Sequence, residues 1–560
     1  MMQEGTSLRR NDRQERQRAS SRARRGEDQD AITKNMAAIL MLTFRGNRQG
    51  EFHLSVLLFN SLTTVSETPQ IAHCPKAATR AGAAPLFILS ATMFFFHGYH
   101  PNSQDSAIYT SSAERVIDPS LFHIDAGFVD GHTRLSVFSH LVAGIAMVLH
   151  SPLSVVQLLC YWFTGLLFLY ACRRMAIRVF VADVSVWSAT VLAGVCSTMP
   201  VAATSLLLMD PYLTARSFST PFSMLALVSC MDRSWKWGIL WAGLALLFHP
   251  LMGIYLCFLL LVLILVDERR FGPAFGILGL VFLSCGVLSL FSRHSPISDA
   301  YRTAALSRSY YFLSCWKWHE LLGIAAPLVL MAIVAVRSGI SSNARNLSAA
   351  CALTGFTSSL ISICFVSTSH PDFLMRVQVL RSFHMIYAVG LVLLGGYIGM
   401  LILRSRLSLA LLLIPVAAMG IADWQSYAST ARIEWPWQRT GNPREEAYRW
   451  IADNTPSNAV FASDTATEHD SEAEGFRSIT RRSTLNDAKD EGIASLFPPL
   501  APQWAQWSDA EYGLNHLTDE QRKNRLRPFG VTWILLSPES KTSFPCPYRN
   551  AQIAVCRITP

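Results

Sequence analysis

The sequence predicts a mainly α-helical polytopic membrane protein of about 11 transmembrane helices, followed by a small C-terminal extracytoplasmic α/β domain. The 560 residues are 51% hydrophobic and only 16% charged, with a mean hydropathy of +0.27. This composition is too apolar for a soluble protein, and the length exceeds one domain. Apolar runs recur from residue 83 to residue 421, whereas an amphipathic helix and short strands are indicated after residue 433.

Residues 1–80 are predicted to form a disordered, basic cytoplasmic tail. Residues 1–34 are rich in arginine and offer almost nothing to bury. They can contact anionic lipid, remain a solvated tail, or precede a true start at Met36. No cleavable signal peptide is evident at the N-terminus.

The segment 81–425 is predicted to be the transmembrane domain. Its candidate spans are 83–98, 152–172, 179–198, 217–231, 237–250, 251–266, 272–291, 320–336, 347–366, 383–403 and 407–421. Several are shorter than the roughly 20 residues of a typical span, so their ends are predicted only to within a turn.

The loop charges predict the orientation of these spans. Lys and Arg accumulate in alternate loops, which places the N-terminus in the cytoplasm and the C-terminal domain outside. The alternation holds only if the run 135–150 does not span. That run is therefore predicted to be an amphipathic or re-entrant helix within the first outer loop, 99–151. The net charge of +9 thus reflects topology and does not indicate a nucleic-acid partner.

The C-terminal segment 433–560 is predicted to be a soluble α/β domain. An amphipathic helix is expected at 443–454, and AVFAS, GVTWILLS and AQIAVCRI are expected to be strands. Acidic residues slightly outnumber basic ones, which argues against electrostatic binding of nucleic acid. Cys546 and Cys556 flank a predicted hairpin and can form a disulfide or remain as two thiols.

Carboxylates gather directly after the first span. Of 15 acidic residues between positions 35 and 421, five lie between His97 and Arg134. Asp105 follows the helix end by about seven residues, and we select it as a candidate catalytic base, with a solvated loop aspartate as the alternative. Asp118 precedes a proline, a position that favours a turn or helix cap, so it is a supporting residue.

Cationic side chains on the same predicted face are candidates for binding phosphate. They are Arg216, Arg376, Arg381, His249 and His384. The arginines violate the positive-inside trend, although they can also snorkel to lipid headgroups, and an interfacial histidine can be merely packed. Asp210 is expected to pair with Arg216 as a supporting salt bridge.

No CxxC pair or His/Cys cluster predicts a zinc site, and we assign no metal ligand or certain cofactor. A divalent cation bound by Asp105 with His132, His140 or His150 is the alternative, although their spacing specifies no geometry.

This organisation resembles the GT-C superfamily of membrane glycosyltransferases. The similar features are an acidic first outer loop with an interfacial helix, about a dozen spans and an outer C-terminal domain. The resemblance implies a polyprenyl-phosphate sugar donor, transfer on the non-cytoplasmic face and a first-loop acid as base. The sequence departs from that family because Asp105 in NSQDSAIY has no adjacent second carboxylate and no DxD motif occurs.

Several motifs look like those of an uncharacterised bacterial membrane family, a domain of unknown function. They are DPSLF (118–122), DPYLTARSFSTP (210–221), LLFHPLMG (246–253), RSFHMIYAVGLVLLGG (381–396), WIADNTP (450–456) and ASLFPPLAPQW (494–504). This resemblance implies the fold and a bacterial source, and it implies no activity.

The leading functional hypothesis is a glycosyltransferase of a bacterial cytoplasmic (inner) membrane, with a polyprenyl-phosphate-linked sugar and membrane lipids as partners. Two other classes remain: a non-enzymatic transporter or flippase of a lipid-linked saccharide, and a membrane scaffold. A transporter would favour charges buried in mid-helix, whereas here the charges collect at one face. In a scaffold, the first-loop carboxylates could be neutralised without loss of function.

Overall fold

The computed structural model describes residues 83–131, 133–293, 296–337, 340–426, 431–439, 441–465, 475–487 and 489–559. The predicted tail 1–80 and His132 lie outside these residues. Residues 414–428 belong to a different compact unit from the rest of the described chain.

A helix occupies each of the eleven apolar runs predicted to span. These helices are α3 (Ala83–His97), α7 (Leu153–Val179), α8 (Asp183–Val195), α9 (Ala215–Met231), α10 (Trp235–Phe248), α11 (Pro250–Asp267), α12 (Phe271–Arg293), α14 (Trp318–Val336), α15 (Ser342–Phe365), α17 (Phe383–Arg404) and α18 (Ala410–Ser426). Among the described residues, seven helical segments are long and apolar enough to cross a membrane: α7, α11, α12, α14, α15, and the segments Phe373–Arg404 and Arg406–Ser426. The protein is therefore a multi-pass membrane protein by helix length and composition, and the number of eleven crossings stays a prediction.

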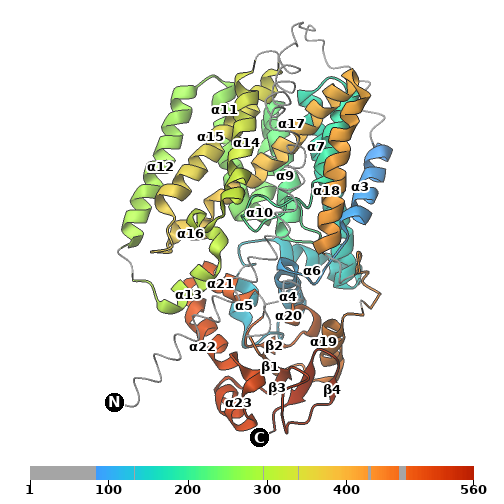
Figure 1. Cartoon of the computed structure of the whole chain (residues 1–560), viewed down its shortest axis with the longest axis vertical. Helices are drawn as coiled ribbons and strands as arrows, with labels where there is room; N and C mark the ends of the chain where they lie inside the picture. Colours follow the sequence, from blue (N-terminus) through green and yellow to red (C-terminus); the bar gives the residue numbers. More distant parts are fainter. Residues whose placement is uncertain are drawn as a thin grey trace, which may run out of the picture. The chain divides into compact units, whose positions relative to one another are not determined.

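Small residues allow the central helices to approach closely. Helix α17 packs along α8. A Cβ atom added at Gly399 would lie 2.5 Å from the Cα of Ser185, and one at Gly395 would lie 2.7 Å from the Cα of Ala189. Because no side chain fits at these positions, glycine is required for this contact. Helix α9 packs in turn against α7 and α10 (Figure 1).

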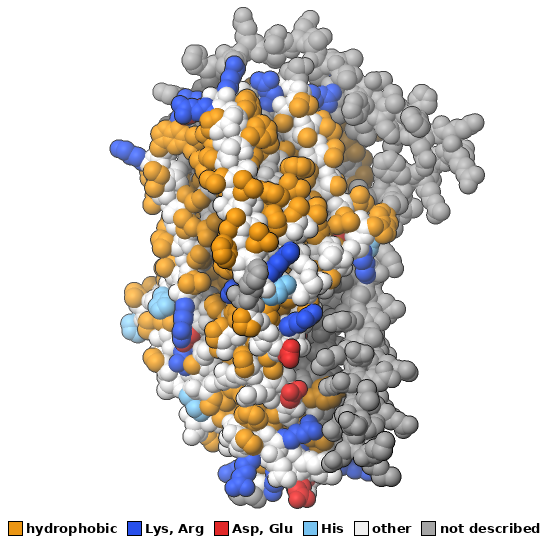
Figure 2. Space-filling view, turned by 90° about the vertical axis from the view of Figure 1, so that its left-hand side faces the viewer, with side chains coloured by type: hydrophobic (Ala, Val, Ile, Leu, Met, Phe, Trp, Pro, Cys, Tyr) orange, Lys and Arg blue, Asp and Glu red, His pale blue; other side chains and the backbone are white. Residues whose placement is uncertain are grey.

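The outer surfaces of several of these helices are apolar. On α12, the side chains of Phe275, Leu280, Leu283 and Phe291 are all exposed. Figure 2 shows hydrophobic side chains covering much of the upper part of one face, with Lys and Arg gathered at its upper margin. A contiguous apolar surface of this kind is what contact with lipid requires.

Three short helices follow α3: α4 (Asp105–Ile117), α5 (Ala126–Gly131) and α6 (Phe138–Leu149). Helix α6 lies in the run that was predicted to be interfacial, and it packs against α4 and α7. Its 12 residues are too few to cross a bilayer as one straight helix. Further along, the loop before α14 contains α13 (Asp299–Ser307), and the segment before α17 contains α16 (Phe373–Val377) and the 3₁₀ turn η4 (Val379–Ser382). The sequence patterns did not predict α13, α16 or η4.

The C-terminal segment forms a five-stranded mixed sheet (Figure 1). Its strands are β1 (Val460–Ser463), β2 (Ser483–Thr484), β3 (Trp533–Leu536), β4 (Tyr548–Arg549) and β5 (Ala554–Arg557), in the order β2-β1-β3-β5-β4. Strand β1 is parallel to β2 and β3, whereas β5 is antiparallel to β3 and β4. The three predicted strands and the predicted helix, α19 (Pro443–Asn454), all occur.

Helices cover both faces of this sheet. On one face, α19 and α20 (Phe476–Thr480) contribute Tyr448 and Phe476, which pack with Phe461. On the other face lie α21 (Asp490–Leu496), α22 (Ala501–Glu511) and α23 (Asp519–Leu526). This second core is continuous with buried residues of α13, α16 and the end of α15. The C-terminal domain and these helices therefore share one hydrophobic core.

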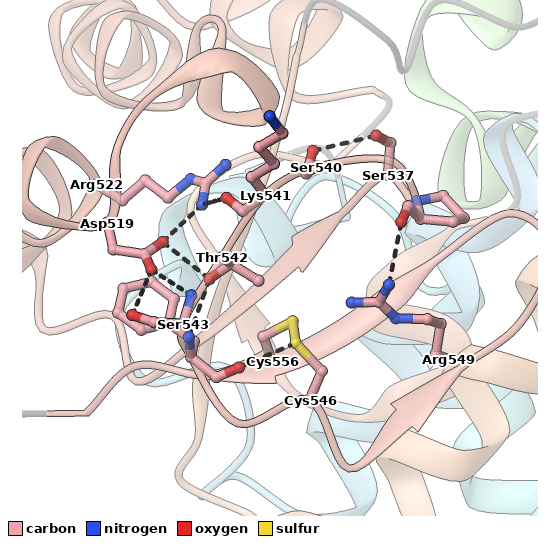
Figure 3. The surroundings of a disulfide bond; sticks show 12 residues. Asp519, Arg522, Ser537, Ser540, Lys541, Thr542, Ser543, Cys546, Arg549 and Cys556 are labelled. Atoms are coloured by element: carbon pink, nitrogen blue, oxygen red, sulfur yellow. Dashed lines mark hydrogen bonds and ion pairs between the residues drawn. A yellow bond between two sulfur atoms is a disulfide. The ribbon is translucent and has the colours of Figure 1, made fainter.

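A disulfide joins Cys546 to Cys556 beside the antiparallel strands (Figure 3). Of the two alternatives open from the sequence, the structure has the bridge. Next to it, Asp519 accepts hydrogen bonds from the hydroxyls of Thr542 and Ser543 at 2.8 Å each, and it pairs with Arg522 at 2.7 Å. Together with the backbone N–H of Ser543, which donates at 2.6 Å, these bonds outweigh the effect of burial and hold the pKa of the partly buried Asp519 at about 2. The contacts tie the irregular segment 540–546 to α23.

Candidate functional site

Asp105 is the first residue of α4 and is about one-third exposed. A carboxylate in the first turn of a helix is stabilised by the helix dipole. The preceding residue, Gln104, has a left-handed backbone with φ of 52°, which turns the chain sharply into α4. Two cations face the Asp105 carboxylate: both terminal nitrogens of Arg216 lie 3.5 Å from its Oδ2 atom, and the Nζ atom of Lys489 lies 3.6 Å from its Oδ1 atom.

Arg216 is a buried cation held by a buried partner. Thr214 caps α9 in a reciprocal arrangement with Ser217, so Arg216 falls in the first turn of that helix. Its Nη2 atom lies 2.7 Å from the Oδ2 atom of Asp210, which also accepts a hydrogen bond from the Thr214 hydroxyl at 3.2 Å. The predicted pairing of Asp210 with Arg216 therefore exists. Burial raises the pKa of Asp210 above its usual range, and the Arg216 charge opposes this shift.

Lys489 comes from the C-terminal domain, and an ion-pair network fixes its position. Arg477 pairs with both carboxylate oxygens of Asp490 at 2.7 and 2.6 Å. It also donates to Asp125, just before α5, and its backbone N–H donates to Asp487 at 3.0 Å. Because Asp487 and Asp490 flank Lys489, this network holds the lysine against α4. The Lys489 ammonium also donates to the side-chain oxygen of Gln104 at 2.6 Å.

Burial raises the pKa of two acids in this interface. Asp490 is almost fully buried, and its pKa rises to about 6, although Arg477 lowers it. On α4, burial raises the pKa of Glu114 to about 7, although Arg481 of the C-terminal domain lowers it by pairing with Glu114 at 2.8 Å. Glu114 joins α4 to the C-terminal domain directly, whereas Asp490 acts through Arg477, which also binds Asp125.

Two further arginines lie within electrostatic range of the same cluster. The hydroxyl of Tyr109 on α4 interacts electrostatically with Asp105, Asp210, Arg216 and Arg381, and burial raises the pKa of this tyrosine. Arg308, at the end of α13, lies 3.8 Å from Glu491. Burial lowers the pKa of its guanidinium, but Tyr310 and Glu491, and more weakly Tyr311 and Asp105, raise it above its ordinary value. Arg216 and Lys489 thus contact Asp105 directly, Arg308 interacts with it electrostatically, and Arg381 shares the neighbour Tyr109 with it.

The remaining predicted residues make contacts of their own. His249 caps α11 and accepts from the backbone N–H of Met252 at 3.4 Å. His384 is buried on α17, bonds the carbonyl of Leu208 at 2.9 Å and lies within electrostatic range of Arg216 and Arg381. These contacts agree with the alternative interpretation, in which both histidines are packed and hydrogen-bonded within the protein.

Arg376 and Asp118 likewise have local contacts. The Arg376 guanidinium lies 5.5 Å from the centre of the Phe373 ring, in a cation–π geometry. Asp118 is exposed and accepts bonds from the backbone and hydroxyl of Ser120 at 3.0 and 2.7 Å, which lower its pKa. Asp118 therefore stabilises a turn, as its position before a proline predicts.

The described residues do not bring candidate metal ligands together. Within those residues, no group of three or more His, Cys, Asp or Glu side chains could hold a metal ion. This applies to His140 and His150, whereas His132 lies outside the described residues.

Sequence reasoning missed Lys489 and Arg308. Arg308 lies in a predicted outer loop, where an arginine violates the positive-inside trend just as Arg216 does. That signal could have identified it. Lys489 lies in a soluble segment among many charges, and no pattern in the sequence distinguishes it.

No family model and no curated protein sequence matches this chain. Among solved structures, the chain is similar to the archaeal oligosaccharyltransferase AglB from Archaeoglobus fulgidus, solved in complex with an inhibitory peptide and a dolichol-phosphate. The similarity covers 81% of this chain and 69% of that chain, with 10% sequence identity and a TM-score of 0.41. At this level of similarity, no site residue can be transferred between the two proteins.

Proposed function

We propose that this protein is a membrane glycosyltransferase that moves a sugar from a polyprenyl-phosphate donor to an extracytoplasmic acceptor. One observation carries the proposal: a partly exposed carboxylate, Asp105, lies among Arg216, Lys489 and further cations in a protein whose helices present an apolar surface. The apolar surface suits a lipid-anchored donor, and the cations suit its phosphate. The carboxylate suits the deprotonation of an acceptor.

In the proposed reaction, Asp105 is the general base. An acceptor hydroxyl or amine attacks the anomeric carbon, and its proton passes to a carboxylate oxygen of Asp105. The bond between the anomeric carbon and the phosphate oxygen breaks, and its electron pair remains on that oxygen. The products are the glycosylated acceptor, the lipid phosphate with one additional negative charge, and protonated Asp105.

The cations stabilise the charge that develops on the leaving phosphate. Guanidinium groups bind phosphate oxygens through two parallel hydrogen bonds, and a preorganised cation acts most strongly where water is excluded. The ion pair with Asp210 fixes the orientation of the Arg216 guanidinium. Arg381 has no ion-pair partner among the described residues, so it is the cation that we assign to the phosphate.

The charge balance of the cluster is consistent with one bound anion. Its four cations are Arg216, Arg308, Arg381 and Lys489. Arg216, Arg308 and Lys489 face three acids, Asp105, Asp210 and Glu491, and Arg381 brings a charge of its own. With all seven groups ionised, the balance is four positive minus three negative charges, or one net positive charge. A glycosyl phosphodiester carries one negative charge and would neutralise it.

The experiment that tests this proposal is donor turnover in lipid nanodiscs. Wild-type protein, Asp105→Asn and a control variant, Asp299→Asn, receive radiolabelled polyprenyl-phosphate sugars with a membrane extract as the acceptor. Asp299 is an exposed carboxylate at the start of α13. We expect lipid phosphate release from wild type and control, and a loss of about 10²- to 10⁴-fold with Asp105→Asn.

Two results would contradict the proposal. Equal turnover by Asp105→Asn would remove this residue as the base. Absence of turnover by wild type across the donor pool, together with movement of a labelled lipid-linked sugar between leaflets, would favour a transporter.

A further inference from the structure

Two cations face the Asp105 carboxylate, and each makes its shorter contact with a different acceptor. Arg216 lies 2.7 Å from Asp210 but 3.5 Å from Asp105. The Lys489 ammonium lies 2.6 Å from the side-chain oxygen of Gln104 but 3.6 Å from Asp105. A charge-assisted hydrogen bond is typically about 2.7–2.9 Å long, and both contacts with Asp105 are longer. The two cations are therefore held mainly by Asp210 and Gln104.

The length of these contacts matters because Asp105 is the proposed general base. A cation in tight contact with a carboxylate stabilises its ionised form, which makes the carboxylate a poorer proton acceptor. It also occupies an oxygen that the proton of the acceptor must reach. Cations held slightly farther away still favour the ionised carboxylate but do not block it, and Asp105 stays about one-third exposed.

Gln104 differs from Asp210 because its amide carries no charge. A carboxylate in its place would neutralise Lys489 and add a second negative charge beside Asp105. The amide oxygen accepts a hydrogen bond from the ammonium and leaves the positive charge uncompensated. Gln104 therefore sets the position of Lys489 and keeps its charge available to a bound phosphate.

The backbone of Gln104 has a conformation that side chains disfavour. Its φ of 52° and ψ of −130° lie outside the regions that residues with a Cβ atom normally adopt, whereas glycine adopts them readily. Such strain persists only where the surrounding structure enforces it, and it is concentrated at functional sites. Glycine would make the same turn at lower cost, so the presence of glutamine indicates that its side chain has a role.

Both ends of the bond between Gln104 and Lys489 are held in place. The Arg477 network fixes Lys489, and the C-terminal domain also packs directly against the turn that contains Gln104. The N–H of Gly475 donates to the carbonyl of Asn102 at 3.2 Å, and a Cβ atom at Gly475 would lie 2.1 Å from that of Ala107. The bond is therefore part of a close contact between α4 and the C-terminal domain.

We propose that Gln104 is a positioning residue, which holds the Lys489 ammonium away from Asp105 so that the carboxylate remains available as the base. This inference rests on the proposed function and adds a residue that acts through Lys489. The other charged and titratable groups that interact with Asp105 keep their places when Gln104 is replaced. They are Tyr109, Asp210, Arg216 and Arg308.

The pH dependence of kcat/KM tests the inference, measured as release of lipid phosphate from radiolabelled polyprenyl-phosphate sugars in nanodiscs. Gln104→Met keeps the length of the side chain and removes the acceptor, whereas Gln104→Glu keeps the acceptor and adds a charge. The matched control is Gln521→Met. Gln521 is exposed on α23, and its side-chain oxygen likewise accepts one bond, from the N–H of Thr518 at 3.0 Å.

In Gln104→Met, the lysine is free to move onto Asp105. We expect kcat/KM near neutral pH to fall by about tenfold, and the acidic limb of the profile to move to lower pH by about one unit. Gln104→Glu should move this limb to higher pH, because it retains the lysine and adds a like charge beside Asp105. The control should match wild type. An acidic limb that neither variant of Gln104 moves would overturn the inference and leave the proposed base in place.

A double variant shows whether Gln104 acts through the lysine. In protein that already carries Lys489→Met, the addition of Gln104→Met should change kcat/KM by less than about twofold, because no lysine remains to be held. A further tenfold loss would show that Gln104 acts in another way, and the inference would then be wrong.

Melting temperatures in detergent add a readout that requires no turnover. The interaction between Asp105 and Lys489 is measured by a cycle of Asp105→Asn, Lys489→Met and the double variant, and the cycle is repeated with Gln104→Met present. We expect the non-additive shift in melting temperature to increase, since Lys489 then pairs directly with Asp105. An unchanged shift would overturn the inference alone. If wild type turns over no donor, the proposed function fails and the catalytic role of Gln104 fails with it.

Discussion

The ammonium of Lys489 in the C-terminal domain lies 3.6 Å from the carboxylate of Asp105 at the start of α4. These residues are separated by most of the chain, and each is held by its own local structure: Asp105 by the first turn of α4, and Lys489 by the Arg477 network. The candidate site is therefore shared between the helical domain and the C-terminal domain. Their common hydrophobic core makes this juxtaposition a fixed part of the fold.

Replacing the lysine should weaken the site without unfolding it. We expect Lys489→Met to lower kcat/KM for a polyprenyl-phosphate sugar by about tenfold or more, since it removes a charged hydrogen-bond donor beside the reacting groups. Lys489→Arg keeps the charge and should retain most of the activity. Steady-state kinetics in nanodiscs measures both variants. Equal activity of wild type and Lys489→Met would show that the contact is only structural.

The buried pair between Asp210 and Arg216 should be important for stability. Asp210→Asn leaves the Arg216 charge buried without its main counter-ion, and we expect a loss of about 3–5 kcal/mol in the free energy of unfolding. Denaturant unfolding in detergent measures this loss. The matched control is Glu268→Gln, which removes the exposed pair between Glu268 and Arg270 and should cost at most about 1 kcal/mol. Similar losses in the free energy of unfolding for the two variants would contradict the stabilising role of the buried pair.

Glu114 should make stability depend on pH. Its pKa of about 7 in the folded protein, against 4.5 ordinarily, means that the folded state binds the proton more tightly. The folded protein therefore loses stability as pH rises from about 4.5 to about 7, by about 3 kcal/mol in total.

The variant Glu114→Gln isolates this effect because it cannot ionise. We expect its melting temperature to match that of wild type near pH 5 and to exceed it near pH 8. Thermal unfolding in detergent across this pH range provides the comparison. A difference in melting temperature that does not change with pH would exclude a titration of Glu114.

The disulfide should stabilise the C-terminal sheet locally. The bridge closes a short loop between Cys546 and Cys556, ten positions apart, and removing it should cost about 3 kcal/mol by the loop-entropy relation. Hydrogen exchange of the β5 amides in the double variant Cys546→Ser/Cys556→Ser measures this loss. A reductant should accelerate exchange in wild type and have no effect on the variant. Unchanged exchange in both would show that the β3–β5 pairing alone holds the strand.

Much of the fold could be predicted from the sequence because its signals are local. Apolar runs predicted a helix in each of eleven segments, an amphipathic pattern predicted α19, and strand patterns predicted β1, β3 and β5. The short elements α13, α16 and η4 were missed, since they have few residues and are held by contacts with distant parts of the chain. The strand β2 was missed for the same reason, because two residues cannot show a period.

The residues of the candidate site were also predicted only in part. The sequence predicted three residues of the site because charged residues beside apolar runs can be recognised from residue type alone. These residues are Asp105, Asp210 and Arg216. The prediction also included His249, His384 and Arg376. Predicted topology assigns residues to one side of the membrane, but it does not tell which of their side chains lie close together.

The sequence by itself determined that this chain makes apolar helices, a C-terminal α/β domain and a collection of charges between them, since helix length, burial and charge follow from local composition. Only the tertiary structure decided that Lys489 contacts Asp105, that Arg308 lies within its electrostatic range, and that His249 and His384 bond to backbone groups. The physical reason is that ion pairs and hydrogen bonds act over a few ångströms, and the packing of helices remote in sequence decides which groups come that close.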